Sequence, residues 1–348
     1  MKKILSLILS AVMLFTVLSG VTSASAKDSA GDLQYRQFNS QHADFNYKGK
    51  TFVKTTYNTD TQKSTVIISA SPNKSGKKIK AKGYVGNTAI DRNYVYYIDY
   101  GASALMRVKK NGKGKKAVIK CAGLGINTEI DFIIDGKYLI YNKTTHDEGY
   151  VTVTSSALYV CKTNGKGKKK IASGVEPNFF TYKGNLYYLK NNRLVKYNLK
   201  KKKSKKIKVN KSLNNAEAIM MVDKKFYIAY GLESPESTGK AQISYGYIDV
   251  KTGKYTNKGT YSDYLDPVHE AFIYNDSLYL SVGTGAGNAI CKAKNGTFDF
   301  DSYDSLYDNY KYSVYDGAGG IGYYNGKAIC KLINFMKSGV FKYSYIKK

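Results

Sequence analysis

The stretch from Phe132 to Ile171 decides the fold class of this chain. It begins Phe132-Ile-Ile-Asp-Gly-Lys-Tyr-Leu-Ile-Tyr141, passes through a polar loop, and ends Ala157-Leu-Tyr-Val-Cys-Lys-Thr-Asn-Gly-Lys-Gly-Lys-Lys-Lys-Ile171. An apolar run and a tyrosine-rich run flank the Asp-Gly turn, and two further short runs flank the Asn-Gly turn. Asp-Gly and Asn-Gly adopt positive φ at little cost and favour tight hairpins. The stretch therefore predicts a meander of four antiparallel strands.

The same unit recurs along the chain. The first turns of its seven copies fall at Lys48-Gly49, Asp91-Arg92, Asp135-Gly136, Lys183-Gly184, Asp223-Lys224, Asn275-Asp276 and Asn325-Gly326. Consecutive turns lie 40–52 residues apart, a period typical of four-stranded propeller blades. Proline is rare, and no amphipathic segment has the length of a helix. We therefore predict an all-β protein, a seven-bladed β-propeller of four-stranded antiparallel blades in a single domain over residues 27–348.

Residues 1–26 are predicted to be a secretory signal peptide that is not part of the fold. Lys2 and Lys3 precede an apolar segment, and Ala24-Ser25-Ala26 has the small residues of a cleavage site. A retained membrane anchor is the alternative, but the apolar segment is shorter than the ~20 residues needed to cross a bilayer. The sequence thus predicts a secreted protein, extracellular or associated with the cell wall, with no membrane span after the signal is removed.

The last unit contains only three candidate strands before the chain ends. An open ring of blades would leave exposed sheet edges. The run Leu33-Gln-Tyr-Arg-Gln-Phe38, near the mature N-terminus, is long enough for one more strand. We predict that this run pairs as the outermost strand of the last blade and closes the ring. The alternative is an unstructured tail.

Two units, Ala104 to Ile119 and Ala157 to Ile171, share a hydrophobic strand, an Asn-Gly-Lys-Gly turn and a final short strand. This pattern resembles the propeller of low-density-lipoprotein-receptor-related proteins. It resembles more closely a family of secreted propellers in Gram-positive bacteria to which no function is assigned. The Tyr-Trp-Thr-Asp sequence of the receptor branch is absent. The resemblance implies a propeller that serves as a binding scaffold, and it supplies neither catalytic residues nor a ligand preference.

Antiparallel order within a blade divides its connections between the two faces of the disc. The first-to-second and third-to-fourth turns form one face, the turn face. The second-to-third loops and the connections between blades form the opposite face, the loop face. Lysines crowd the third-to-fourth turns, and the residues predicted to bind polyanions are Lys113, Lys115, Lys116, Lys166, Lys168, Lys169, Lys201, Lys202 and Lys203.

Most carboxylates fall in the connections of the loop face, which include the longest loops. Long loops on a rigid scaffold are where binding residues concentrate. We therefore predict that the loop face binds a sugar or peptide through tyrosine stacking and carboxylate hydrogen bonds. The candidate ligand-binding residues are His146, Asp147, Glu148 and Tyr264.

The net charge of the chain indicates which kinds of partner it could bind. The chain has 55 Lys and Arg against 26 Asp and Glu, a net charge of +29, and only four of the basic residues are arginine. A lysine excess on one face predicts binding to an anionic cell-wall polymer or glycan, or to a protein partner. Nucleic-acid binding is disfavoured because it relies on arginine for bidentate contacts. The alternative is that the lysines keep a tyrosine-rich β-protein soluble and protect its sheet edges.

Few residues are candidates for catalysis or metal binding. Asp266, His269 and Glu270 are the first catalytic candidates, because a histidine beside carboxylates can act as a general base. Solvated loop residues are the alternative. Asp299, Asp301 and Asp304 resemble half of a calcium loop but lack the glycine and closing glutamate of an EF-hand, and an irregular solvated insertion is the alternative. No motif requires a cofactor.

The four cysteines, Cys121, Cys161, Cys291 and Cys330, have no zinc-ligand spacing and are expected to be free. Cys161 takes the place of Val108 in the preceding unit, as a small core residue does. The sequence as a whole predicts a secreted, non-catalytic binding or scaffold propeller at the cell surface. A propeller enzyme acting on polysaccharide, either a hydrolase or a lyase, is the alternative.

Overall fold

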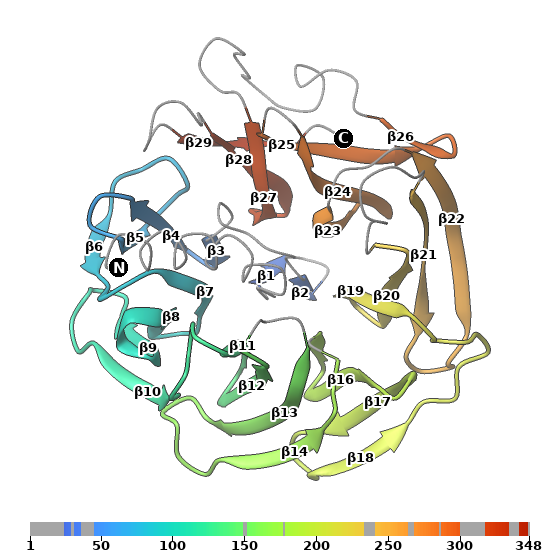
Figure 1. Cartoon of the computed structure of the whole chain (residues 1–348), viewed down its shortest axis with the longest axis horizontal. Helices are drawn as coiled ribbons and strands as arrows, with labels where there is room; N and C mark the ends of the chain where they lie inside the picture. The colour runs from blue at the N-terminus through green and yellow to red at the C-terminus, as the bar shows by residue number, and fades with distance from the viewer. Residues whose placement is uncertain are drawn as a thin grey trace.

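The computed structural model of the chain describes residues 24–28, 31–35, 45–148, 152–176, 178–232, 241–263, 268–284, 287–299, 317–333 and 341–346. Seven antiparallel sheets stand around a common axis (Figure 1). This confirms the seven-bladed β-propeller, and the blades are numbered 1–7 in chain order. In the part of the chain just given, the short 3-10 turn η1 (Tyr100–Ala102) is the one helical element.

In each blade the strands follow one another from the axis to the rim in chain order (Figure 1). Blades 1–3 consist of β3 (Phe45–Lys48), β4 (Thr51–Asn58), β5 (Lys63–Ser69) and β6 (Lys77–Lys80); β7 (Val85–Ile90), β8 (Tyr94–Asp99), β9 (Ala104–Lys109) and β10 (Lys116–Lys120); and β11 (Thr128–Asp135), β12 (Tyr138–His146), β13 (Val153–Lys162) and β14 (Lys169–Ser173).

Blades 4–7 complete the ring. They consist of β15 (Phe179–Tyr182), β16 (Asn185–Lys190), β17 (Arg193–Asn198) and β18 (Lys203–Lys206); β19 (Ala216–Val222), β20 (Lys225–Tyr230), β21 (Ala241–Asp249) and β22 (Tyr255–Asp263); β23 (Val268–Tyr274), β24 (Ser277–Thr284), β25 (Gly287–Lys294) and β26 (Thr297–Asp299); and β27 (Gly317–Tyr324), β28 (Lys327–Ile333) and β29 (Phe341–Tyr345).

The turns have the geometry that their residues favour. Gly136 in the β11–β12 turn has φ +56°, and in the corresponding turn of blade 6 Asn275 and Asp276 have φ +49° and +62°. Glycine, asparagine and aspartate are the residues that tolerate this left-handed region. The β11–β12 pairing begins at Asp135 and Tyr138, directly beside the turn, so the turn sets the register of the hairpin.

The core lies between blades rather than inside them. Phe132 and Leu139 of blade 3 share a cluster with Tyr96 and Leu105 of blade 2, and similar clusters fill the other junctions. Burying one such side chain contributes about 1.5–3 kcal/mol. A blade therefore gains most of its stability from its two neighbours, and the ring must close.

The predicted closing strand is in a different place. β1 (Ala24–Asp28) and β2 (Gly31–Tyr35) form a hairpin, and β2 pairs with β19 of blade 5 near the axis (Figure 1). The prediction that Leu33–Phe38 pairs with the last blade is therefore wrong for Leu33–Tyr35, and Arg36–Phe38 lie outside the described residues. The inner edge of β19 faces the axis. Without a neighbouring strand its backbone N–H and C=O groups would be unpaired, and β2 pairs with them. Part of β1 belongs to the predicted signal peptide.

Aromatic packing and side-chain hydrogen bonds, above all those of the Asn73 amide, join blade 7 to blade 1. Phe45 and Phe52 of blade 1 stack with ring centroids 5.5 Å apart, and Tyr343 of β29 meets both rings edge-on at 5.1 and 5.2 Å. Asn73, in the β5–β6 turn, accepts a hydrogen bond from the backbone N–H of Tyr343 at 2.9 Å and donates one to its carbonyl at 3.0 Å. The amide thus pairs with the outer edge of β29 as one residue of a fourth strand would.

Lys54 holds the turn that presents Asn73. Its ammonium group donates to the carbonyls of Pro72 at 2.6 Å and Lys74 at 3.2 Å. Burial lowers the pKa of Lys54 below its usual value. The two carbonyls supply the partners that a buried ammonium needs.

Replacing Asn73 by alanine is expected to lower the free energy of unfolding by about 1–2 kcal/mol, because two backbone groups of β29 lose their partners. Urea unfolding would measure the change. Asn93→Ala is the matched control, since that side chain is exposed in the β7–β8 turn. Equal stability of the two variants would contradict the closing role of Asn73.

Candidate functional site

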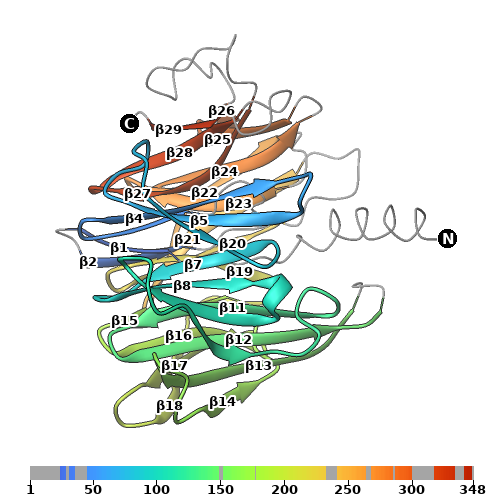
Figure 2. The ribbon, with the colours of Figure 1, turned by 90° about the vertical axis from the view of Figure 1, so that its left-hand side faces the viewer.

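The antiparallel topology divides the connections of each blade between two faces, as predicted. In Figure 2 the turn face lies on the left and the loop face on the right. All nine lysines predicted to bind polyanions are exposed, and they lie in or directly after the third-to-fourth turns of blades 2, 3 and 4. The structure therefore gathers them on three consecutive blades of the turn face.

Contacts between blades hold these turns in place. In blade 3, a Cβ atom on Gly165 would lie 2.4 Å from the carbonyl oxygen of Val118 in β10, so the turn fits closely against blade 2. Arg107 of blade 2 donates from Nη1 to the carbonyl of Thr163 at 3.1 Å, and its guanidinium lies 4.5 Å from the centre of the Tyr94 ring. The lysine turn is thus a fixed part of the scaffold.

Two glycines of one turn test this contact. Gly165 and Gly167 both have positive φ, +84° and +68°, but a Cβ on Gly167 would meet nothing within 4 Å. Alanine at either position strains the backbone by about 1–2 kcal/mol. Gly165→Ala is expected to cost at least about 1 kcal/mol more than Gly167→Ala in urea unfolding, because the Val118 backbone cannot yield. Equal losses would mean that the turn does not depend on blade 2.

The ion pairs of the turn face lie elsewhere on the ring. Lys224 pairs with Asp249 at 2.8 Å, and both Lys225 and Lys258 pair with Asp276. Partial burial would raise the pKa of Asp276, but hydrogen bonds from Lys258 and Tyr227 outweigh it and hold the pKa below its usual value. None of the nine lysines has a carboxylate within ion-pair distance among the described residues.

On the loop face, unequal blade heights create a cleft. The strands β12 and β13 have 9 and 10 residues, whereas β16 and β17 of the next blade have 6 each. An extended residue adds about 3.3 Å, so the β12–β13 hairpin stands ~10 Å above blade 4. Figure 2 shows this hairpin reaching past its neighbours. The part of its sheet that faces blade 4 is therefore left partly uncovered.

The face of blade 3 that turns toward blade 4 changes character along its height. Its lower part carries Ile133, Ile140 and Leu158, which belong to the core shared with blade 4. Cross-strand pairing places Asp131 opposite Asn142 on the same side of the sheet, one step higher. Next comes Glu129 opposite Thr144, and Thr144 pairs in turn with Ser156. The hydrophobic pattern ends where blade 4 ends.

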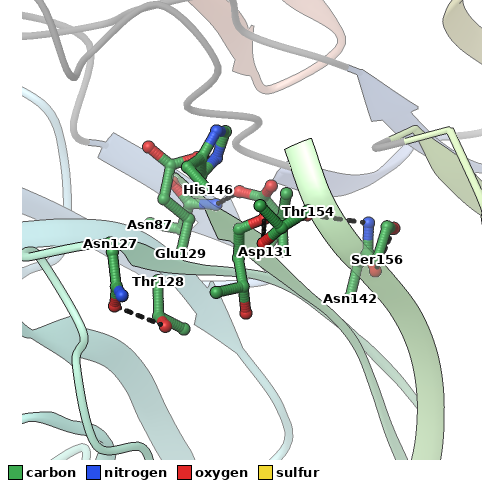
Figure 3. A network of polar contacts seen from close by, with 11 residues as sticks. Asn87, Asn127, Thr128, Glu129, Asp131, Asn142, His146, Thr154 and Ser156 are labelled. Carbon is green, nitrogen blue, oxygen red and sulfur yellow. Dashed lines mark hydrogen bonds and ion pairs between the residues drawn. The ribbon is translucent and has the colours of Figure 1, made fainter. Parts of the chain in front are cut away.

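The polar residues of this cleft line a cavity of about 680 Å³. Nε2 of the buried His146 lies 3.7 Å from Oε2 of Glu129, and Asn87 of blade 2 donates from Nδ2 to Asp131 at 2.8 Å (Figure 3). Ser156 donates to the carbonyl of Val175 at 2.7 Å. Carboxylates, hydroxyls and an imidazole thus come together from three strands of one blade.

Hydrogen bonding, not aromatic stacking, is what the cavity offers a ligand. Among the described residues, Tyr159 is the one aromatic side chain in its lining. Tyr141 stacks on that ring with centroids 5.0 Å apart, and the Lys168 ammonium lies 5.3 Å from its centre. The ring is already used for packing, so tyrosine stacking is not supported here. Carboxylate and hydroxyl oxygens remain to bind sugar hydroxyls or amino groups.

The predicted ligand-binding residues are only partly brought together. His146 lines the cavity, whereas Asp147 and Glu148 follow it along the hairpin and are not among the lining residues. Asp147 accepts a hydrogen bond from the backbone N–H of Thr152 at 3.1 Å, which closes the base of the loop. Tyr264 lies outside the described residues.

The catalytic and metal candidates are described only in part. Asp266, Asp301 and Asp304 fall outside the described residues, as do the side chains of His269 and Asp299. Glu270 is buried in β23, with an exposed fraction of 2%. Asp299 ends the strand β26. Within the described ranges, no three His, Cys, Asp or Glu side chains come together as metal ligands.

The cavity acids Glu129, Asp131 and Glu176 belong to the carboxylates that the sequence assigns to the loop face, but they were not among the predicted ligand-binding residues. Asn87 and Asp131 each stand five residues before the second residue of their blade's first turn, Arg92 and Gly136. Both positions lie within the buried run of an inner strand, where a polar residue interrupts the hydrophobic pattern. This interruption, compared across blades, could have pointed to the site.

The cysteines are free and buried, as expected. Burial raises the pKa of Cys161 to about 11, so its thiol stays protonated at neutral pH and is a poor nucleophile. In the described part of the chain, no helix has the length and hydrophobicity to cross a bilayer.

No family model matches the chain, and no curated protein matches it in sequence. The uncomplexed acylaminoacyl peptidase of Pyrococcus horikoshii is similar in structure, with a TM-score of 0.52 and 11% identity over 95% of this chain and 52% of that one. An oligogalacturonate lyase in complex with manganese has a TM-score of 0.51 and 9% identity over 94% and 96%. A chain of a nidogen/laminin complex has a TM-score of 0.38 and 13% identity over 70% and 80%.

At these identities the similarities show the fold alone. The propeller implied by the sequence resemblance is confirmed, and membership of a secreted bacterial family remains a prediction. A peptidase and a lyase share this fold, so the fold does not select between such activities.

Proposed function

We propose that this protein is a secreted, non-catalytic binding propeller of the cell surface or cell wall. Its turn face holds an anionic polymer, and its loop face binds a sugar or peptide. The observation that carries the proposal is the set of nine exposed lysines on blades 2, 3 and 4, without carboxylate partners among the described residues. Lysines that served only solubility would not need to gather on one side of the ring.

Elementary electrostatics supports an anionic polymer as the partner. Unpaired like charges on one surface repel one another, and a polyanion relieves that repulsion while releasing its own counterions. Lysine is a flexible point charge that suits phosphate or carboxylate groups of irregular spacing, whereas arginine selects a planar geometry. The scarcity of arginine therefore favours binding of a polymer through its charge over sequence-specific recognition of a nucleic acid.

Removing the lysine charges of one blade tests the turn face. Lys166, Lys168 and Lys169 changed together to Gln are expected to lower the salt slope of binding to poly(glycerol phosphate) by roughly 2, because each lost contact removes about 0.7. Affinity measured from about 50 mM to 500 mM salt gives this slope.

The control removes the same net charge from the opposite face. Lys82, Lys190 and Lys211 lie in or beside connections of the loop face, where Lys82 and Lys211 are exposed and Lys190 is half-buried. Their change to Gln is expected to leave the slope within experimental error. Equal losses in both variants would mean that net charge alone attracts the polymer, and the proposed role of the turn face would be wrong.

The loop face has its own test. Glycan and peptide arrays would identify a ligand, and Glu176→Gln combined with Thr154→Ala is expected to weaken it about tenfold, the effect of one or two lost hydrogen bonds. Both side chains line the cavity and are exposed. If the double variant Asp147→Asn with Glu148→Gln lost binding instead, the ligand would bind at the loop above the cavity. Unchanged binding in both double variants would exclude the loop face of blade 3.

The pair His146 and Glu129 favours one second candidate, an enzyme acting on polysaccharide as a hydrolase or lyase. An imidazole and a carboxylate in one cavity can serve as an acid and a base. Such an enzyme would release reducing or unsaturated ends from an acidic polysaccharide, and His146→Gln would abolish this release. In a binding module neither product forms, and the two candidates are separated by that assay.

A further inference from the structure

The outer two strands of blades 1–4 carry no carboxylate at all. Residues 63–80, 104–120, 153–173 and 193–206, which span these strands and their turns, contain five, seven, five and eight Lys or Arg and no Asp or Glu. The corresponding parts of blades 5 and 6 are mixed, since Asp249, Asp263 and Asp299 accompany their lysines. The basic residues therefore form a band on one side of the ring, wider than the nine lysines of the turns.

Almost every charge of the band reaches solvent. Arg107, Lys110 and Lys196 are buried or half-buried, and the remaining basic residues of the band are exposed. The lysines of the outermost strands are exposed as well as those of the turns. In β18 all four residues are exposed, and in β6 three of four are. Within the described residues no carboxylate pairs with them.

The band is continuous from blade to blade. Lys115 of blade 2 donates to the carbonyl of Lys80 in blade 1 at 3.0 Å. Gly165 of blade 3 lies against Val118 of blade 2. Leu199, in the third-to-fourth turn of blade 4, packs in one cluster with Ile171 of blade 3. Each turn thus rests on the outer strand of the blade before it, and no gap separates the four groups of charges.

We propose that one flexible, linear polyphosphate or polyphosphodiester chain binds along this band and contacts four consecutive blades, from blade 1 to blade 4. The proposal rests on the polyanion binding proposed above and extends it to blade 1 and to the outer strands. It also sets an orientation: the molecule meets the polymer with the rim of blades 1–4, and blades 5–7 point away. The loop-face cavity of blade 3 then stays open to its own ligand.

The curvature of the rim selects the class of polymer. The band follows half of a closed ring (Figure 1). A flexible chain bends along such a path at little cost, whereas duplex DNA has a persistence length of about 50 nm and would touch only one or two blades. Chain length therefore matters, because each further blade adds contacts within one bound polymer.

Blade 1 is the decisive place to test the band. Lys77, Lys78 and Lys80 changed together to Gln are expected to weaken binding of inorganic polyphosphate of about 100 units roughly tenfold at low salt, and to lower the salt slope by about 2. Binding of tripolyphosphate, which is too short to join two blades, is expected to change less than about twofold. Thermal unfolding would establish that the variant is folded.

The matched control lies on the other side of the ring. Lys251, Lys254 and Lys294 are exposed in the third-to-fourth turns of blades 5 and 6 or beside them, and their change to Gln removes the same charge. Long polyphosphate is expected to bind this variant as it binds the unaltered protein. A blade 1 variant that behaves like this control would overturn the band.

The remaining outcomes separate the two proposals. Should the blade 3 variant lose binding while the blade 1 variant does not, the turn-face proposal stands and the four-blade band falls. Should neither lose binding, both fall. Duplex DNA that binds as tightly as polyphosphate of equal charge, and depends equally on blade 1, would overturn the assignment of a flexible chain. Poly(glycerol phosphate) that binds like inorganic polyphosphate would support it.

Discussion

Each blade of this propeller buries its sheet faces only against its neighbours, and the structure depends on that constraint. The apolar clusters span the junctions, so an isolated four-stranded sheet would expose both of its faces. A ring meets the requirement only if its last blade packs against its first. Here the junction is made by the rings of Phe45, Phe52 and Tyr343 and by the amide of Asn73. The amide of Asn73 forms hydrogen bonds with the edge strand of blade 7, as a strand shared between the first and last blades would do.

The same constraint explains where function is free to develop. The residues of each sheet that face a neighbouring blade are needed for packing. The residues on the rim, and those at the ends of the strands on the loop face, are not. On the rim of blades 1–4 the exposed charged residues are basic, and nearly all of them are lysines. At the upper end of blade 3 the strands outgrow those of blade 4, and polar residues replace apolar ones at that height. Both candidate surfaces therefore begin where burial against a neighbour stops.

The two surfaces differ in how firmly their residues are held. The cavity residues are tied by buried contacts such as Asn87 to Asp131, and they come from regular strands. The lysines are long and exposed, but their turns rest on neighbouring blades through close backbone approaches such as that of Gly165. A preformed cavity suits a small polar ligand, and mobile charges on a fixed frame suit a polymer.

The sequence by itself determined the repeat, the turn types and the side of the disc on which the lysines lie. These follow from local chemistry: Asp-Gly and Asn-Gly turns, strands with tyrosine and β-branched residues, and antiparallel alternation. Only the tertiary structure decided how the ring closes, because Asn73 and Tyr343 are 270 residues apart and no local pattern links them. It also decided that Glu129, Asp131 and His146 share a cavity, since that depends on the height of the neighbouring blade. Contacts between blades depend on how the blades pack, so they cannot be predicted from the sequence of a single repeat.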